Sequence, residues 1–174
     1  IKAQTHAVFS NVNAILEAIQ EKQLDATPLC VITNQADAGV LEVAQQYGVP
    51  THVVPHQGVT RQEHEAQLLN TLKQYTWDYM VLAGYMRIFS PECIQTLQSH
   101  EHPRIINIHP SMLPAFPGIA GYEDAFNYGV KYSGVTVHFV NEGVDSGPII
   151  LQIPFERLDT DTLEAFQARG LKLE

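Results

Sequence analysis

Short apolar segments alternate with stretches of helical periodicity along most of the 174 residues, and this alternation restricts the fold more than any other feature. Four apolar segments are each of a length suited to one buried strand: 29–32, 51–54, 79–83 and 105–108. Between them, apolar residues recur three and four apart, as they also do after Ser10 and Asn11. A β-α-β series of this kind predicts a parallel sheet with right-handed crossovers.

Capping residues mark the expected helix boundaries. Thr60 and Glu63 have the spacing of a capping box, and Ser90 precedes a proline at the first helical position. Gly48 is a suitable residue for ending a helix that begins near Ala38, and residues 161–164 are suited to cap the last helix.

After residue 130 the apolar period changes from helical to alternating. Residues 135–140 and 149–151 predict two strands that pair antiparallel. We therefore expect one α/β domain over 1–174, with a mostly parallel, doubly wound, Rossmann-like sheet and an antiparallel edge. Ligands bind beyond the carboxyl ends of strands in such sheets, so the loops after Thr5, Leu82 and Ile108 are the expected location of function.

Charge and cysteine content narrow the functional classes. Ten Lys and Arg residues against 19 Asp and Glu give a net charge of -9, which disfavours binding to nucleic acid. Cys30 and Cys93 lie in apolar stretches without a C-x-x-C spacing, as expected of buried thiols in a reducing cytoplasm. The sequence contains no apolar run of about 18 residues, so we expect a cytoplasmic protein without a membrane partner.

Asn107 and His109 are the first candidates for chemistry. They lie two residues apart at a predicted strand end and precede a loop with three prolines, which should hold them in a fixed direction. An amide donor beside an imidazole can stabilise an oxyanion while a proton moves. A hydrogen-bonded structural histidine is the alternative interpretation of this pair alone.

Asp145 lies in a second polar segment, residues 140–148, where by itself it would be an ordinary turn aspartate. Together, the N-I-H-P-S-M-L-P-A-F-P-G segment (107–118), the 140–148 turn, the V-L-A-G-Y-M-R-I segment (81–88) and the G-V-T-V-H-F-V segment (134–140) resemble folate-dependent formyltransferases. Within these, the chain is similar to the phosphoribosylglycinamide formyltransferase family from about Asn11 to Glu174.

The resemblance implies transfer of a formyl group from 10-formyltetrahydrofolate, as co-substrate, to the amine of glycinamide ribonucleotide in purine biosynthesis. It assigns proton transfer to His109, stabilisation of the formyl oxygen to Asn107, and support of protonated His109 to Asp145. It implies small-molecule substrates, no metal, and a monomer or homodimer.

The resemblance also assigns two binding sets. The folate set is Arg61, Met86, Arg87, Ile88, Phe89, Asn107, Val140 and Val144. The ribonucleotide set is Ser10, Asn11 and Glu174, with backbone amides at a helix N-terminus meeting the phosphate. Without the resemblance, Met86 could fill a core, Arg61 could be solvated, Ser10 would be an N-cap and Glu174 a surface charge.

Three departures from the family pattern bear on activity. The family's first loop is glycine-rich, whereas residues 6–9 read H-A-V-F, after a segment 1–5 that is less apolar than a buried strand. Ala120 stands where the family usually has histidine. Residues 170–173 differ from the family's polar pattern, and we expect the family's next element to be missing after them.

Two other functions share the same residues. A formyltetrahydrofolate hydrolase would use the same Asn, His and Asp, although that class typically carries an added N-terminal regulatory domain. A folate-binding protein without turnover would fit a degraded phosphate loop. A methionyl-tRNA formyltransferase would need a basic tRNA-binding domain, which the charge disfavours.

His52 with His56 and His100 with His102 have metal-compatible spacing but lack accompanying ligands, so we expect no metal.

Overall fold

A computed structural model describes residues 2–98 and 102–174, with side chains from residue 9 onward. The chain forms two compact units, which we describe separately. The first contains residues up to Asp78 together with Ala83–Tyr85, and the second contains Tyr79–Leu82 and Met86–Glu174. His100 of the second histidine pair lies outside the described residues.

The first unit is built around a small parallel sheet. In chain order its elements are α1 (Lys2–Gln20), β1 (Val31–Thr33), α2 (Val40–Gln46), β2 (Thr51–Val53) and α3 (Arg61–Leu72). β1 and β2 pair parallel, with Val31 opposite Thr51. The buried core between α1 and α2 consists of Leu16, Val43, Ala44 and Val49. Apolar residues three and four apart therefore bury one face of each helix, as their spacing predicts.

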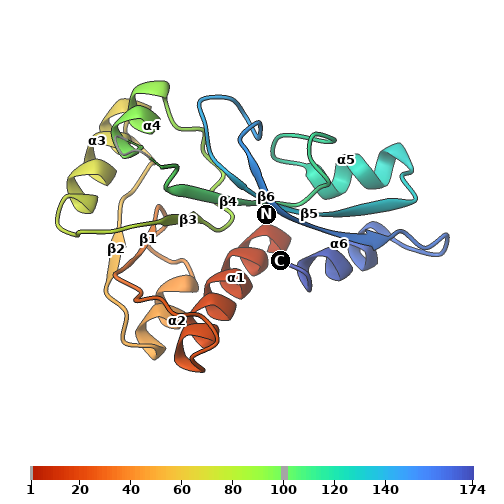
Figure 1. Ribbon diagram of the computed structural model, residues 1–174, viewed down its shortest axis with the longest axis horizontal. Helices are drawn as coiled ribbons and strands as arrows, with labels where there is room; N and C mark the ends of the chain where they lie inside the picture. The colour runs from red at the N-terminus through yellow and green to blue at the C-terminus, as the bar shows by residue number, and fades with distance from the viewer. Residues whose placement is uncertain (1, 99–101) are drawn as a thin grey trace. The chain divides into compact units, whose positions relative to one another are not determined.

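The second unit holds a four-stranded sheet in the order β3-β4-β5-β6 (Figure 1). Its elements are β3 (Met80–Leu82), α4 (Pro91–Leu97), β4 (Ile105–His109), α5 (Gly121–Tyr128), β5 (Tyr132–Phe139), β6 (Ile149–Glu156) and α6 (Leu163–Leu171). β3 and β4 pair parallel, whereas β4–β5 and β5–β6 pair antiparallel. An aromatic core joins α5, α6 and β6 through Tyr122, Phe155 and Phe166. The predicted α/β class with an antiparallel edge is confirmed.

The predicted helix caps are confirmed as well. The Thr60 side chain accepts from the Glu63 N–H, and the Glu63 carboxylate accepts from the Thr60 N–H, so both halves of the capping box form. Ser90 caps α4 ahead of Pro91, and Thr162 caps α6. Gly48 follows α2 with a φ of 69°, the left-handed conformation that glycine favours.

The N-terminal segment differs from expectation. We expected a strand over residues 1–5, a loop after Thr5, and a helix starting at Ser10. The structure instead has one helix from Lys2 to Gln20, so Ser10 is not an N-cap. The physical reason is local, because residues 2–20 contain neither glycine nor proline to interrupt a helix and are rich in alanine. With this segment helical, the described strands are divided between two sheets.

The cysteines are both free thiols. Cys93 is buried as predicted, whereas Cys30 is only half-buried, and burial raises its pKa above the ordinary value. Within residues 2–98 and 102–174, no helix has both the length and the apolar character needed to cross a membrane.

The capping box yields a first prediction. Thr60→Ala removes the acceptor of the Glu63 N–H at the start of α3, and we expect a loss of about 1 kcal/mol in the free energy of unfolding. Thr60→Ser keeps a hydroxyl acceptor, so its free energy of unfolding should be close to that of the unaltered protein. Urea denaturation of the three proteins measures the difference, and equal midpoints for all three would contradict the assigned cap.

A second prediction concerns Asp161, whose side chain is 4% exposed. The guanidinium of Arg169 donates to both carboxylate oxygens, at 2.6 and 2.7 Å, and holds the pKa of Asp161 at about 2, below its ordinary 3.8. The unfolded chain therefore takes up this proton at higher pH than the folded chain. The contribution of Asp161 to stability is complete above about pH 4 and is lost as the pH falls through about 2.

Asp161→Asn should lower the stability at pH 7 and flatten the decline in stability between pH 4 and 2. Asp159→Asn is the matched control, since Asp159 pairs with Lys131 on the surface, where its side chain is 85% exposed and screened by salt. Denaturant midpoints across this pH range measure both effects. An unchanged acid decline in the Asp161 variant would contradict the assignment.

Candidate functional site

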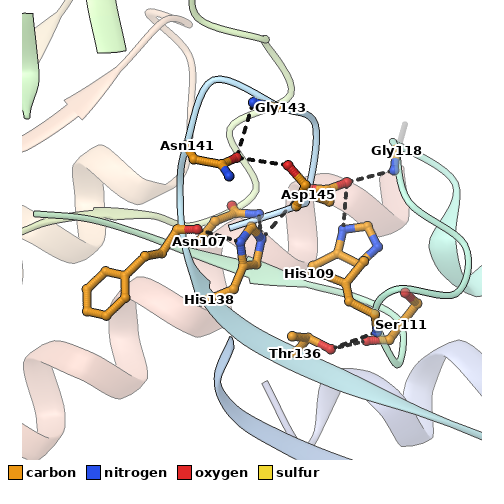
Figure 2. A network of polar contacts seen from close by, with 12 residues as sticks. Asn107, His109, Ser111, Gly118, Thr136, His138, Asn141, Gly143 and Asp145 are labelled. Carbon is orange, nitrogen blue, oxygen red and sulfur yellow. Dashed lines mark hydrogen bonds and ion pairs between the residues drawn. The ribbon is translucent and has the colours of Figure 1, made fainter. Parts of the chain in front are cut away.

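A group of polar side chains gathers where β4 ends beside β5. In the antiparallel register, Asn107 lies opposite His138 and His109 lies opposite Thr136. Side chains two apart on a strand share a face, so this register places Asn107, His109 and His138 on one side of the sheet. Figure 2 shows them converging on Asp145, which the turn between β5 and β6 brings to the same point.

His109 is held at both ring nitrogens. Its side chain is 3% exposed, and Nε2 lies 2.9 Å from the carbonyl oxygen of Phe116. A carbonyl oxygen can only accept, so Nε2 carries a proton and donates it. Nδ1 faces Asp145 Oδ2 at 3.4 Å. A proton gained at Nδ1 therefore lies between the imidazole and a carboxylate oxygen.

Asp145 adopts a left-handed backbone conformation, with a φ of 48°. Aspartate is among the residues that tolerate this region. Its Oδ2 atom accepts from the Gly118 N–H at 2.7 Å, and Oδ1 lies 3.7 Å from Nε2 of His138. The carboxylate thus bonds to the loop after β4 and lies close to imidazoles on two strands.

The turn that carries Asp145 is fixed by its own polar contacts. Asn141 Oδ1 accepts from the Gly143 N–H at 3.1 Å and from the Ser146 hydroxyl at 3.0 Å. Gly147 packs against the backbone carbonyl of Phe139, where a Cβ would overlap the oxygen. The glycine at this position is therefore required by close backbone approach.

The loop after His109 is anchored on β5. The Thr136 hydroxyl, which is fully buried, donates to the Ser111 carbonyl at 2.6 Å and accepts from the Leu113 N–H at 3.1 Å. Gln152 on β6 donates to both Thr136 Oγ1 and the Leu113 carbonyl. These contacts fix the segment that leads to Phe116 and Gly118, the partners of His109 and Asp145.

His138 is the member of this group that the sequence interpretation missed. In the sequence it is a polar position of the alternating residues 135–140 and part of the 134–140 family segment, with no role assigned to it. Its side chain is 3% exposed, with Nε2 at 3.2 Å from Asn107 Nδ2 and Nδ1 at 2.9 Å from the Phe139 carbonyl oxygen. The signal that identifies it is the strand pairing, which makes it the cross-strand neighbour of Asn107.

The predicted folate set falls in both units. Met86 and Ile88 are exposed at 45% and 59%, so Met86 does not fill a core. Phe89 is buried and Val144 is half exposed. The other members in the second unit are Arg87, Asn107 and Val140, while Arg61 is an exposed residue at the start of α3 in the first unit.

The predicted ribonucleotide set also spans both units. Ser10 and Asn11 lie inside α1 in the first unit, and the Asn11 side chain is buried. The expectation of a helix N-terminus at these two residues is wrong, because α1 begins at Lys2. Glu174 lies in the second unit and accepts a hydrogen bond from the Tyr122 hydroxyl at 2.7 Å.

An amide, an imidazole and a carboxylate at one strand end provide what acyl transfer requires, namely an N–H donor for a developing oxyanion and a group that moves a proton. Among the described residues, no three His, Cys, Asp or Glu side chains are grouped so as to hold a metal ion. This arrangement of a donor and a proton-transfer group is suited to acyl-transfer chemistry.

The chain belongs to the formyl transferase family, whose model matches residues 5–174. It is 38% identical over 166 residues to phosphoribosylglycinamide formyltransferase of Bacillus subtilis, an alignment that covers 95% of this chain and 83% of the relative. The crystal structure of glycinamide ribonucleotide transformylase 1 from Symbiobacterium toebii matches with a TM-score of 0.88 and 39% identity, covering 95% of this chain and 77% of that one.

A relative of different activity is equally similar in sequence. Formyltetrahydrofolate deformylase of Haemophilus influenzae is 39% identical over 151 residues, which are 87% of this chain and 52% of the relative. The family predicted from the sequence motifs is confirmed, and the roles of individual site residues remain predictions.

Proposed function

We propose that this chain transfers the formyl group of 10-formyltetrahydrofolate to the primary amine of glycinamide ribonucleotide. The observation that carries the proposal is the grouping of Asn107, His109 and Asp145 near the end of β4, with His138 between Asn107 and Asp145, in a chain similar to two enzymes named for this reaction. The product would serve purine biosynthesis.

Each residue has a chemical task in this reaction. The amine attacks the formyl carbon and gives a tetrahedral intermediate, whose oxygen becomes negative and is stabilised by an N–H of Asn107. The bond between that carbon and N10 of the folate then breaks, and N10 leaves with a proton. His109 handles this proton at Nδ1, the nitrogen beside Asp145, whose negative charge favours the protonated imidazole.

Binding of the folate would use the exposed apolar residues of the 86–89 segment. Met86 and Ile88 offer uncovered apolar surface for the pterin, and Val144 lies one residue before Asp145 in the turn. Val140 and Phe89 complete the apolar part of the set. The anionic glutamate tail would be met by Arg87.

Recognition of the ribonucleotide would fall to Glu174. The Tyr122 hydroxyl holds the Glu174 carboxylate by a 2.7 Å hydrogen bond. Residues 6–11 lie beyond the first turn of α1, so their N–H groups donate within the helix and not to a ligand. The phosphate should therefore add little to affinity.

The similarity to a deformylase favours a second candidate function, hydrolysis of 10-formyltetrahydrofolate with water in place of the amine. Residues 6–11 are helical and form no phosphate-binding loop, which adds to this candidate. Mixing the protein with 10-formyltetrahydrofolate, with and without glycinamide ribonucleotide, separates the two functions. Turnover only with the ribonucleotide supports transfer, turnover without it supports hydrolysis, and binding without turnover indicates a folate-binding protein.

His109→Ala and Asp145→Ala should each lower kcat on the order of 10²- to 10⁴-fold while the chain stays folded, because both groups act on the tetrahedral intermediate. Asparagine also adopts the left-handed φ of position 145 but carries no charge, so Asp145→Asn should lose about as much activity as Asp145→Ala. Asn107→Asp should also be severe, since it sets a negative charge near the oxyanion. Steady-state kinetics with thermal unfolding as the folding control tests all four, and near-normal turnover in folded His109→Ala or Asp145→Ala would refute the mechanism.

The helical N-terminus makes a prediction about phosphate. Glycinamide ribonucleotide and its dephosphorylated riboside should bind with dissociation constants within about threefold of each other, a difference of less than ~1 kcal/mol. Isothermal titration calorimetry measures both constants. If the ribonucleotide bound about 100-fold more tightly than the riboside, the inference that the helical residues 6–11 do not bind the phosphate would be wrong.

A further inference from the structure

His138 is buried beside the proposed catalytic residues, and the mechanism above gives it no task. It lies directly across from Asn107 in the β4–β5 register, next to an irregularity in the β5–β6 pairing at Val137/His138. Its own partner on β6 is the apolar Ile149. The polar neighbours of its ring are therefore Asn107, the Phe139 carbonyl and Asp145.

The ring has one proton position that the structure determines. Nδ1 lies 2.9 Å from the Phe139 carbonyl oxygen, which can only accept, so Nδ1 carries the hydrogen. In the neutral ring the other nitrogen, Nε2, then has a lone pair and acts as an acceptor. The histidine is thus set as donor to the backbone and acceptor toward Asn107.

This acceptor determines which way the Asn107 amide faces. Nδ2 of Asn107 lies 3.2 Å from Nε2, so the amide nitrogen donates one of its two hydrogens to the ring. The reversed amide would place its carbonyl oxygen against the ring's lone pair, bringing two acceptors together. With the nitrogen held here, the second N–H of Asn107 diverges from the ring and is aimed away from His138.

Protonation of His138 would undo this arrangement. Nε2 would become a donor and would favour the carbonyl oxygen of Asn107 or Oδ1 of Asp145, now 3.7 Å away. The titratable groups facing the ring are Asp145 from the β5–β6 turn and, through that carboxylate, His109 from β4. The neutral ring is therefore the form that accepts from Asn107, while Asp145 is held by the Gly118 N–H.

We propose that His138 is a positioning residue that fixes the amide of Asn107 with its nitrogen, and not its oxygen, available to the formyl group. This inference rests on the proposed formyl transfer for its catalytic meaning. The orientation itself is a property of the protein without substrate.

The first test reads the tautomer directly. In protein labelled with ¹⁵N-histidine, long-range ¹H–¹⁵N correlations should show His138 neutral at pH 7 with its hydrogen on Nδ1. A hydrogen on Nε2, or a ring protonated at both nitrogens, would overturn the proposal. Because no substrate is present, this result does not depend on the proposed function.

Two variants separate positioning from a structural role. In His138→Asn, the side-chain amide reaches the place of Nδ1 and can donate to the Phe139 carbonyl, but it is too short to contact Asn107. In His138→Gln, the side-chain oxygen reaches the place of Nε2 and can accept from Asn107. The two substitutions therefore keep opposite halves of the histidine's contacts.

We expect His138→Asn to lower kcat on the order of 10- to 100-fold, which does not exceed the decrease expected from removing an oxyanion donor. The KM for the folate should stay within about twofold of its value in the unaltered protein. His138→Gln should keep kcat within about threefold. If the ring served only to donate to the Phe139 carbonyl, His138→Asn would keep a higher kcat than His138→Gln. That outcome would overturn the proposal. Thermal unfolding verifies that both chains fold.

A double substitution completes the test. In an Asn107→Ala background, adding His138→Asn should change the remaining kcat by less than about twofold, because His138 acts through Asn107. A full additional loss would assign His138 a role independent of Asn107. If the unaltered protein transfers no formyl group, the proposed function fails while the tautomer measurement still decides the orientation of Asn107.

Discussion

The pairing register between β4 and β5 is the constraint on which the site depends. It places Asn107 opposite His138 and His109 opposite Thr136. The first pair holds the amide that is proposed to donate to the formyl oxygen, and the second places the threonine that anchors the loop after β4 beside His109. Thr136 then fixes the loop after β4, and that loop returns the Phe116 carbonyl and the Gly118 N–H to the site. A shift of one residue would turn every one of these side chains to the opposite face.

Much of this arrangement follows from short-range sequence features. The caps at Thr60, Ser90 and Thr162 involve residues three apart, so each contact depends only on the residues of one helical turn. The shared direction of Asn107 and His109 follows from the period of a strand. Asp145 was recognised through its turn and the family pattern, and the structure brings it within 3.4 Å of His109.

Two features differ from the sequence-based prediction, for different reasons. The part played by His138 depends on which residue of β5 faces Asn107, a relation between segments about 30 residues apart that alternation alone does not specify. The N-terminal helix was missed because the family pattern favoured a strand and a glycine loop there. Local helix propensity over residues 2–20 contradicts that pattern.

The left-handed backbone at Asp145 also limits which acid can stand at this position. Asparagine and aspartate enter this region far more readily than longer side chains, because their short polar groups bond to nearby backbone. A glutamate would add a methylene to a carboxylate already 2.7 Å from the Gly118 N–H, and would do so on a less favourable backbone. The backbone conformation of the turn therefore favours aspartate over glutamate at position 145, independently of the reaction that the carboxylate serves.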